Sequence, residues 1–222
     1  MDSLSPIDTI VAGLRNEGWC HCPTFLAPEL VADLRADLLA QRDRFATANV
    51  GRANARQQVL EQRNDSTLWL SGTGAAQREF LAQMDHLRQQ LNRQLLLGVA
   101  DYEAHYAHYA VGQFYRRHVD AFRQDDERQC IKRRAAQRIV SSIFYLNDAW
   151  QLGDGGELVL WREPVQEEQE ALHIAPLSGS AVFFLSAEFP HEVLPAVRDR
   201  YSIAGWFRSQ PTSVSQGATR DR

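Results

Sequence analysis

The sequence has few cysteines, no long apolar run and little net charge, and each of these absences argues against a class of protein. Only Cys20, Cys22 and Cys130 are cysteines among 222 residues, so we do not expect a disulfide framework. No window reaches the roughly 18 consecutive apolar residues of a membrane span, and the N-terminal segment lacks the pattern of a secretory signal. The net charge of −4 gives no overall attraction for nucleic acid or an anionic membrane. We therefore predict a cytoplasmic protein with neither a membrane nor a nucleic-acid partner.

Helix signals are confined to the N-terminal part of the chain, whose composition of 44% hydrophobic and 23% charged residues permits one sizeable core. Ser5 followed by Pro6 is typical of a helix start, and we expect this first helix to end before Gly18. A second helix is expected after Pro28 and a third over residues 77–97, because apolar residues recur there at helical spacing. These helices are expected to pack against the core.

From Tyr102 onward the apolar residues alternate with polar ones, which predicts strands. We expect them at residues 104–110, 139–146, 157–161, 181–185 and 201–207, and many short strands indicate a sandwich or barrel. The polar segment 46–65 should contribute little to the core, as a mobile loop or hairpin finger. The charged segment 123–138 is expected to be a solvated loop or a short rim helix, and the tail 209–222 to be disordered.

Two histidines and an aspartate suggest a metal site. His118 and Asp120 are two residues apart, so in a strand they would project to the same face, although a surface histidine beside an aspartate would give the same pattern. His191 follows much later in the chain. Two imidazoles and one carboxylate leave adjacent positions open on a metal, as non-haem iron(II) oxygenases require. Zinc at the Cys-His-Cys run of residues 20–22 is an alternative, but no second ligand cluster accompanies it.

Arg200 stands nine residues after His191 and directly before a predicted strand. An iron oxygenase that uses a 2-oxo acid needs a buried cation for the far carboxylate of that acid. Arginine suits this role because its planar guanidinium pairs bidentately with a carboxylate and stays charged when desolvated. A surface arginine on a strand edge is the plainer alternative.

Four motifs together resemble the 2-oxoglutarate and Fe(II)-dependent dioxygenases, and specifically the prolyl 4-hydroxylase branch that includes the oxygen-sensing prolyl hydroxylases and their bacterial counterparts. The motifs are Tyr-x-x-Gly-x-x-Tyr-x-x-His-x-Asp at residues 109–120, Tyr145-Leu146-Asn147 with Trp150, Asp-Gly-Gly-Glu-Leu at 154–158, and Pro-His-Glu-Val at 190–193 with Arg200. The resemblance covers residues 109–207.

This resemblance implies a fold, a ligand set and a co-substrate site. The fold would be α+β and mainly β, with a double-stranded β-helix (jelly roll) over residues 101–208, helical support over 1–100 and one domain over 1–208. Iron would be held by His118, Asp120 and His191. The 2-oxoglutarate would be bound by Arg200 and Tyr145, with Tyr109 and Trp206 lining its pocket. Substrate contacts are predicted for Arg138, Arg63, Asp65 and Tyr115.

Some positions depart from the pattern. Arg63-Asn64-Asp65 with Trp69 resembles an Arg-Gly-Asp-x-x-x-Trp element that follows a flexible finger in the oxygen-sensing branch, but the central glycine is Asn64 here. Ala204 stands where relatives often carry threonine, and the insertion over residues 122–137 is longer than in the oxygen sensors.

The resemblance implies hydroxylation of prolyl C4 in a protein or peptide. Fe(II) would be the cofactor, 2-oxoglutarate and O₂ the co-substrates, and succinate and CO₂ would be released. Ascorbate would be a reductant, and a translation factor is a candidate target by family analogy. Two alternatives stay open: the same chemistry on a free amino acid, a small metabolite or an alkylated nucleobase, and a jelly-roll binding or sensing protein without turnover.

Overall fold

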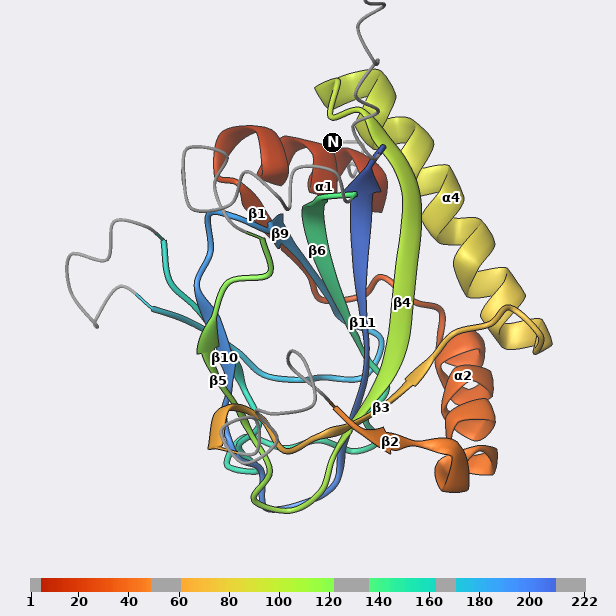
Figure 1. Cartoon of the computed structure of the whole chain (residues 1–222), viewed down its shortest axis with the longest axis vertical. Helices are drawn as coiled ribbons and strands as arrows, with labels where there is room; N and C mark the ends of the chain where they lie inside the picture. The colour runs from red at the N-terminus through yellow and green to blue at the C-terminus, as the bar shows by residue number, and fades with distance from the viewer. Residues whose placement is uncertain (1–4, 49–60, 122–135, 163–170, 211–222) are drawn as a thin grey trace, which may run out of the picture.

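The computed structural model describes residues 5–48, 61–121, 136–162 and 171–210 (Figure 1). Among the described residues of the N-terminal part, the α-helices are α1 (Pro6–Asn16), α2 (Pro28–Ala40) and α4 (Ala75–Leu95), with a 3₁₀ turn η1 (Arg42–Arg44). The start of α1 is the predicted one, because the Ser5 hydroxyl accepts the amide N–H of Asp8 at 3.2 Å and Pro6 occupies the first turn. No helix within these ranges is both long and apolar enough to cross a membrane.

Eleven strands form two antiparallel sheets in the described ranges. The larger sheet has the order β1-β9-β6-β11-β4-β3-β2 and the smaller one the order β5-β10-β7-β8. The strands of the larger sheet are β1 (Trp19–Cys22), β2 (Ala46–Thr47), β3 (Ser66–Trp69), β4 (Val99–Tyr109), β6 (Arg138–Tyr145), β9 (Ala181–Leu185) and β11 (Arg200–Ser209). Those of the smaller sheet are β5 (Tyr115–His118), β7 (Leu158–Leu160), β8 (Leu172–Ile174) and β10 (His191–Val193).

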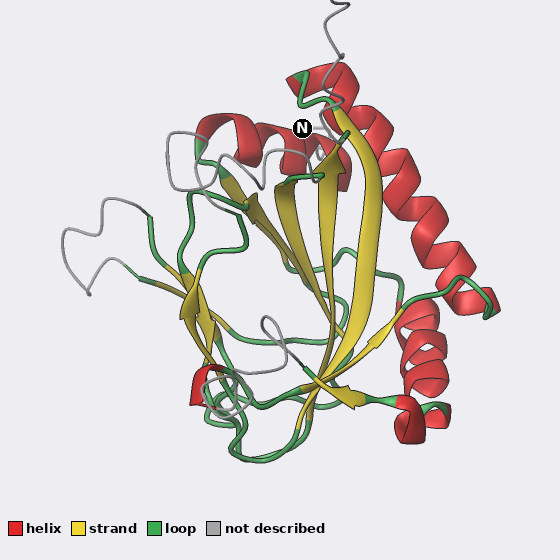
Figure 2. Cartoon of the chain, in the orientation of Figure 1, coloured by secondary structure: helices red, strands yellow, loops and turns green. Residues whose placement is uncertain are grey.

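The larger sheet separates two hydrophobic clusters. Figure 2 shows α2 and α4 along one side of this sheet and the smaller sheet on its other side. Side chains alternate between the two sides along each strand, so in β6 Val140 and Phe144 pack with the helices whereas Ile143 and Tyr145 face the smaller sheet. This is the double-stranded β-helix with supporting helices that the motifs predicted. The space between the two sheets is where a site can form.

Several sequence predictions are corrected in detail. Six short strands, β1, β2, β3, β5, β8 and β10, lie outside the predicted strand ranges, because two to four residues are too few for a clear alternation. The described ends of the segment 46–65 add little to the hydrophobic core, as expected: Ala48 is 3% exposed, and the fully buried Asp65 is charged. The middle of the segment, residues 49–60, lies outside the described residues, as do most of the charged segment 123–138 and the tail from residue 211.

Candidate active site

His118, Asp120 and His191 come together between the two sheets. His118 ends β5 and His191 begins β10, and the pairing of these strands makes the two histidines direct cross-strand partners. Their Nε2 atoms lie 3.8 Å and 3.6 Å from the Asp120 carboxylate oxygens Oδ1 and Oδ2, respectively. One ligand atom from each of the three residues lies within 4.8 Å of the others. The strand pairing therefore assembles a cluster that could hold a metal ion.

The two imidazoles are oriented by main-chain carbonyls. The Nδ1 atoms of His118 and His191 lie 2.8 Å from the Arg116 oxygen and 3.0 Å from the Phe189 oxygen. Because a carbonyl oxygen can only accept, each Nδ1 carries a proton, and in a neutral imidazole this leaves the lone pair on Nε2, the atom nearer Asp120. Asp120 itself lies just beyond the end of β5, and its carboxylate still comes together with His118.

The protonation states in this cluster are those that bind a metal. Burial, together with the neighbouring His191, lowers the pKa of His118 to about 3. Burial alone would raise the pKa of Asp120, but His191, His118, the Trp206 N–H and Arg138 together lower it. At neutral pH the cluster therefore offers a neutral imidazole and a carboxylate.

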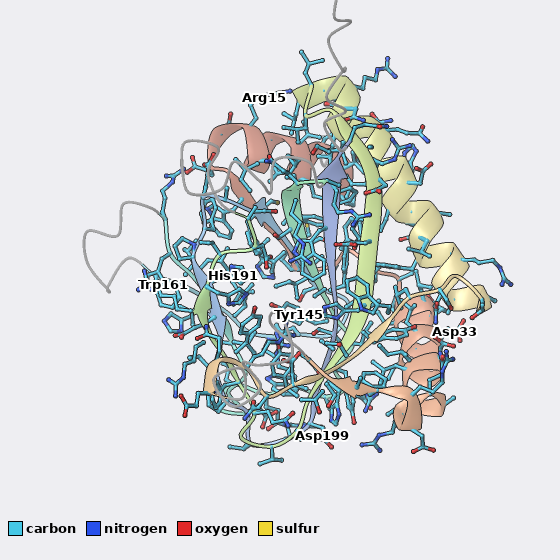
Figure 3. All side chains as sticks on the ribbon, in the orientation of Figure 1. Arg15, Asp33, Tyr145, Trp161, His191 and Asp199 are labelled. Atoms are coloured by element: carbon cyan, nitrogen blue, oxygen red, sulfur yellow. The ribbon has the colours of Figure 1, made fainter. Side chains whose placement is uncertain are left out.

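A cavity of about 500 Å³ extends from this cluster to a buried arginine. Arg200 lines this cavity and is 1% exposed, and the fully buried Tyr145 has its ring 5.2 Å from the Arg200 guanidinium. Figure 3 shows Tyr145 in the space between the sheets, with His191 on the smaller sheet. Within the described residues, Arg200 Nη2 and the Tyr145 hydroxyl have no hydrogen-bond partner. Two unpaired donors on a buried wall, one of them cationic, are matched by an anionic ligand.

A glycine permits the arginine to lie where it does. Arg200 Nε donates to the Gly156 carbonyl at 2.9 Å and Nη1 to the Ser202 hydroxyl at 3.2 Å, which leaves Nη2 free. Gly156 has a φ of +69°, and a Cβ there would lie 3.1 Å from Arg200 Cδ. This turn conformation and this close approach both favour glycine. The Asp-Gly-Gly motif therefore supports the arginine.

Comparison with known proteins agrees with this geometry. Residues 104–208 match the model of the 2OG-Fe(II) oxygenase superfamily. A crystal structure of a Pseudomonas putida prolyl-4-hydroxylase is 36% identical, covers 92% of this chain and 99% of its own, and superposes with a TM-score of 0.77. The chain belongs to the prolyl hydroxylase branch of that superfamily.

More distant relatives share the fold. A Trichoplax adhaerens prolyl hydroxylase, solved with a peptide of hypoxia inducible factor, is 24% identical over 91% of this chain and 89% of its own, with a TM-score of 0.74. A hypoxia-inducible factor prolyl hydroxylase of Caenorhabditis elegans is 24% identical over 212 residues, which are 89% of this chain but 27% of that protein. The predicted family and enzyme class, with Fe(II), 2-oxoglutarate and O₂ as cofactor and co-substrates, are confirmed by the family model and the Pseudomonas putida relative.

Tyr109 and Trp206, the other two residues predicted for the co-substrate pocket of this prolyl hydroxylase, both line the cavity. They lie at different ends of it. Tyr109 is 4% exposed and its ring lies 5.1 Å from the Arg200 guanidinium, at the arginine end. Trp206 lies at the metal end, where its Nε1 donates to Asp120 Oδ2 at 2.8 Å. Trp206 thus contacts a candidate metal ligand and lies away from Arg200.

Three of the four predicted substrate-contacting residues, Arg63, Asp65 and Tyr115, contact one another in series beside the metal cluster. Arg63 donates twice to Asp65, at 2.7 Å each, and its guanidinium lies 4.2 Å from the Tyr115 ring. The Tyr115 ring in turn stacks on His118 with 3.5 Å between centroids. Asp65 lies beneath Arg63 and does not line the cavity, whereas Arg63 and Tyr115 do. The Arg63–Asp65 ion pair thus packs on the Tyr115 ring, which in turn packs on His118.

Asn64 fits where the resembling motif has glycine. Its amide N–H donates to the Phe114 carbonyl at 3.3 Å, and its side-chain oxygen accepts the Phe114 N–H at 2.8 Å. Asn64 is not among the described residues with a positive φ, so no glycine conformation is required here.

Arg138, the fourth predicted substrate-contacting residue, also lines the cavity, and its guanidinium lies 3.6 Å from the centre of the Trp206 ring.

His105 is a cavity residue that the sequence analysis missed. Its ring centroid lies 5.2 Å from that of Trp69 and 5.4 Å from that of Trp206. On the neighbouring strand β11, its cross-strand partner is Ala204. Its Nδ1 lies 3.1 Å from the Tyr106 carbonyl, so Nε2 is the acceptor. The alternation of the predicted strand could have indicated this position, because His105, Ala107 and Tyr109 lie on one face of β4 and all line the cavity.

His105 should make the protein less stable in acid. Burial, then the charge of Arg63, lowers the pKa of His105 from 6.5 to about 4. The unfolded chain binds the proton more tightly, so His105 costs stability as the pH falls from about 6.5 to about 4, by up to about 3 kcal/mol. Urea unfolding of the wild type and His105→Phe over this range checks it. Equal pH slopes in the two proteins would contradict the assignment.

Proposed function

We propose that this protein is a peptidyl-prolyl 4-hydroxylase that uses Fe(II), 2-oxoglutarate and O₂, and that residues 1–208 act as one catalytic domain. The observation that carries the proposal is that Arg200, whose Nη2 has no partner among the described residues, lines the same cavity as the His118, Asp120 and His191 cluster. The buried Tyr145, whose hydroxyl is likewise unpaired there, has its ring 5.2 Å from the Arg200 guanidinium. Such a cavity can hold both the metal and a dicarboxylate that reaches from it to the arginine. Neither feature alone would distinguish an oxygenase from a simple metal site.

Each residue has a definite task in this proposal. His118, Asp120 and His191 would hold the iron, and Arg200 with Tyr145 would bind the C5 carboxylate of 2-oxoglutarate by charge-assisted hydrogen bonds. Iron with O₂ and 2-oxoglutarate supplies the oxidation: one oxygen atom enters succinate as CO₂ leaves, and the other becomes the hydroxyl of the product. The protein contributes position and a cavity that excludes water.

The aromatic and cationic side chains near the metal end favour a peptide over a small metabolite. Trp69 is 53% exposed and continues the row of His105 and Trp206, with Arg138 over the latter. A prolyl ring packs well on aromatic faces, while the guanidinium can bind a peptide carbonyl. The relative at 36% identity is a prolyl-4-hydroxylase, which supports the same substrate class here.

A peptide assay distinguishes this proposal from the small-molecule alternative. Cell proteins and synthetic proline-containing peptides are incubated with the enzyme, Fe(II), 2-oxoglutarate and air, with ascorbate as the proposed reductant. We expect an added oxygen on proline, located at C4 by fragmentation and amino-acid analysis, and stoichiometric succinate. The inactive control is the Asp120→Ala variant. Turnover on free amino acids or metabolites, with no oxidised proline in any protein, would overturn the prolyl assignment.

The same proteome experiment tests the proposed target. A translation factor is our candidate by family analogy, and its hydroxylated proline should appear only in samples treated with the active enzyme. Oxidation of a different protein would replace this candidate without affecting the proposed chemistry. No succinate under any condition would instead indicate a binding protein.

A further inference from the structure

Asp120 is held by side chains from other strands, since it lies past the end of β5. Its Oδ2 accepts a hydrogen bond from the Ser141 hydroxyl at 2.7 Å and another from Trp206 Nε1 at 2.8 Å. Ser141 on β6 and Trp206 on β11 are cross-strand partners, so the sheet register places both donors side by side. The next residue, Ala121, donates its N–H to the Ser186 carbonyl at 3.2 Å.

Ser141 and Ser186 form a directional pair of buried hydroxyls behind the carboxylate. They are 1% and 0% exposed, and their Oγ atoms lie 2.8 Å apart. Ser141 has one proton, and it is donated to Asp120, so the proton between the two serines belongs to Ser186. The hydrogen bonds therefore run from Ser186 to Ser141 to Asp120. Ser186 thus supports both the backbone after Asp120, through its carbonyl, and the carboxylate, through Ser141.

The two donors have a chemical consequence for the carboxylate. A carboxylate oxygen has about two lone-pair sites, and Ser141 with Trp206 occupies both on Oδ2. Oδ1 accepts no hydrogen bond from the described residues; it lies 3.8 Å from His118 Nε2 and 3.8 Å from Arg138 Nη1. A carboxylate that offers one oxygen takes one coordination position on a metal, whereas a bidentate one takes two. The co-substrates of this family need those further positions.

We propose that the Ser186–Ser141 pair is a positioning device that keeps Asp120 a one-oxygen ligand through Oδ1. The inference rests on the proposed iron site and deepens it: the serines touch neither substrate nor metal and act through Asp120. Residues that orient metal ligands typically contribute about 10–100-fold to metal affinity. Loss of the Ser141 hydroxyl should have an effect in this range and should also change the coordination geometry.

The test is a titration of the apoprotein with Co(II), followed by visible absorption spectroscopy without substrate or turnover. We expect Ser141→Ala to bind Co(II) about 10–100-fold more weakly, with weaker d–d bands if a second carboxylate oxygen raises the coordination number. Ser141→Thr retains a hydroxyl and should restore both readouts. Ser186→Ala should show a smaller change in the same direction, because it acts through Ser141.

Ser142→Ala is the matched control. Ser142 is the neighbour of Ser141 on β6, is equally buried at 1% exposure, and donates its hydroxyl to the Gly205 carbonyl at 3.1 Å on the other side of the sheet. The Ser142→Ala protein should be less stable than the wild type but should bind Co(II) with the same affinity. If Ser141→Ala and Ser142→Ala bind Co(II) alike, with unchanged spectra, the inference is wrong. If the wild type binds no Co(II), the iron site itself fails. Should Ser141→Ala not fold, Ser186→Ala and Ser141→Thr decide the question by the same spectra.

Discussion

The His118→Ala variant is expected to lose Fe(II) binding and, with it, all turnover of 2-oxoglutarate. His118 Nε2 is one of three ligand atoms within 4.8 Å of each other, and alanine offers no donor in its place. Removing a ligand should cost more than the 10–100-fold in affinity that is typical for loss of a supporting residue. The measurement is the dissociation constant of Fe(II) or Co(II), by titration under anaerobic conditions, with succinate release as the second readout.

His108→Ala is the matched control for this prediction. His108 lies on β4, its side chain is 20% exposed, and its Nε2 pairs with Asp199 at 3.1 Å outside the metal cluster. The substitution is the same in both variants, but only His118 belongs to the cluster. A His118→Ala protein that binds iron as tightly as His108→Ala would refute the assignment of this histidine as a ligand.

Replacement of Arg200 by methionine should weaken 2-oxoglutarate binding while iron binding persists. The substitution keeps the apolar stem and removes the cation whose Nη2 has no partner among the described residues. A charge-assisted hydrogen bond contributes about 1.5–3 kcal/mol, which corresponds to an increase of about 10–150-fold in the KM for 2-oxoglutarate. Initial rates of succinate formation measure it.

A second co-substrate separates binding from misfolding in this experiment. Wild-type enzyme should prefer 2-oxoglutarate to a 2-oxo acid without the C5 carboxylate, and Arg200→Met should lose that preference, which a general loss of folded protein would not cause. Arg198→Met is the control, since the Arg198 side chain is 42% exposed and pairs with Asp154 outside the cavity. A preference that survives in Arg200→Met would mean that another group binds the carboxylate.

The chemistry of this site could be predicted from the sequence because its members carry distinctive side chains at characteristic spacing. Each of His118, Asp120, His191 and Arg200 has a plain surface alternative when taken alone, and it was their combination with the surrounding motifs that was informative. Their positions within the cavity were less predictable. The pair of His118 and Asp120 was expected within or beside a strand, but the sequence did not indicate that Ser141 and Trp206 would hold Asp120 just past the strand end.

The supporting residues could not be predicted for a physical reason. Serine is common, and a buried serine hydroxyl has a role only through what lies opposite it. Ser141 and Ser142 are adjacent and equally buried, yet one contacts Asp120 and the other the Gly205 carbonyl. The direction in which each residue points follows from strand register, because a shift of one residue would exchange the two faces.

By itself, the sequence determined the family, the iron and 2-oxoglutarate chemistry and the helices and long strands, since these follow from local periodicity and from motifs of unusual residues. Only the tertiary structure decided which residues meet. The pairing of β5 with β10 brings His118 to His191, and the β6–β11 register places Ser141 beside Trp206 against Asp120. These contacts join segments far apart in the chain, and burial between two sheets is what makes a lone hydroxyl or an unpaired guanidinium N–H matter for function.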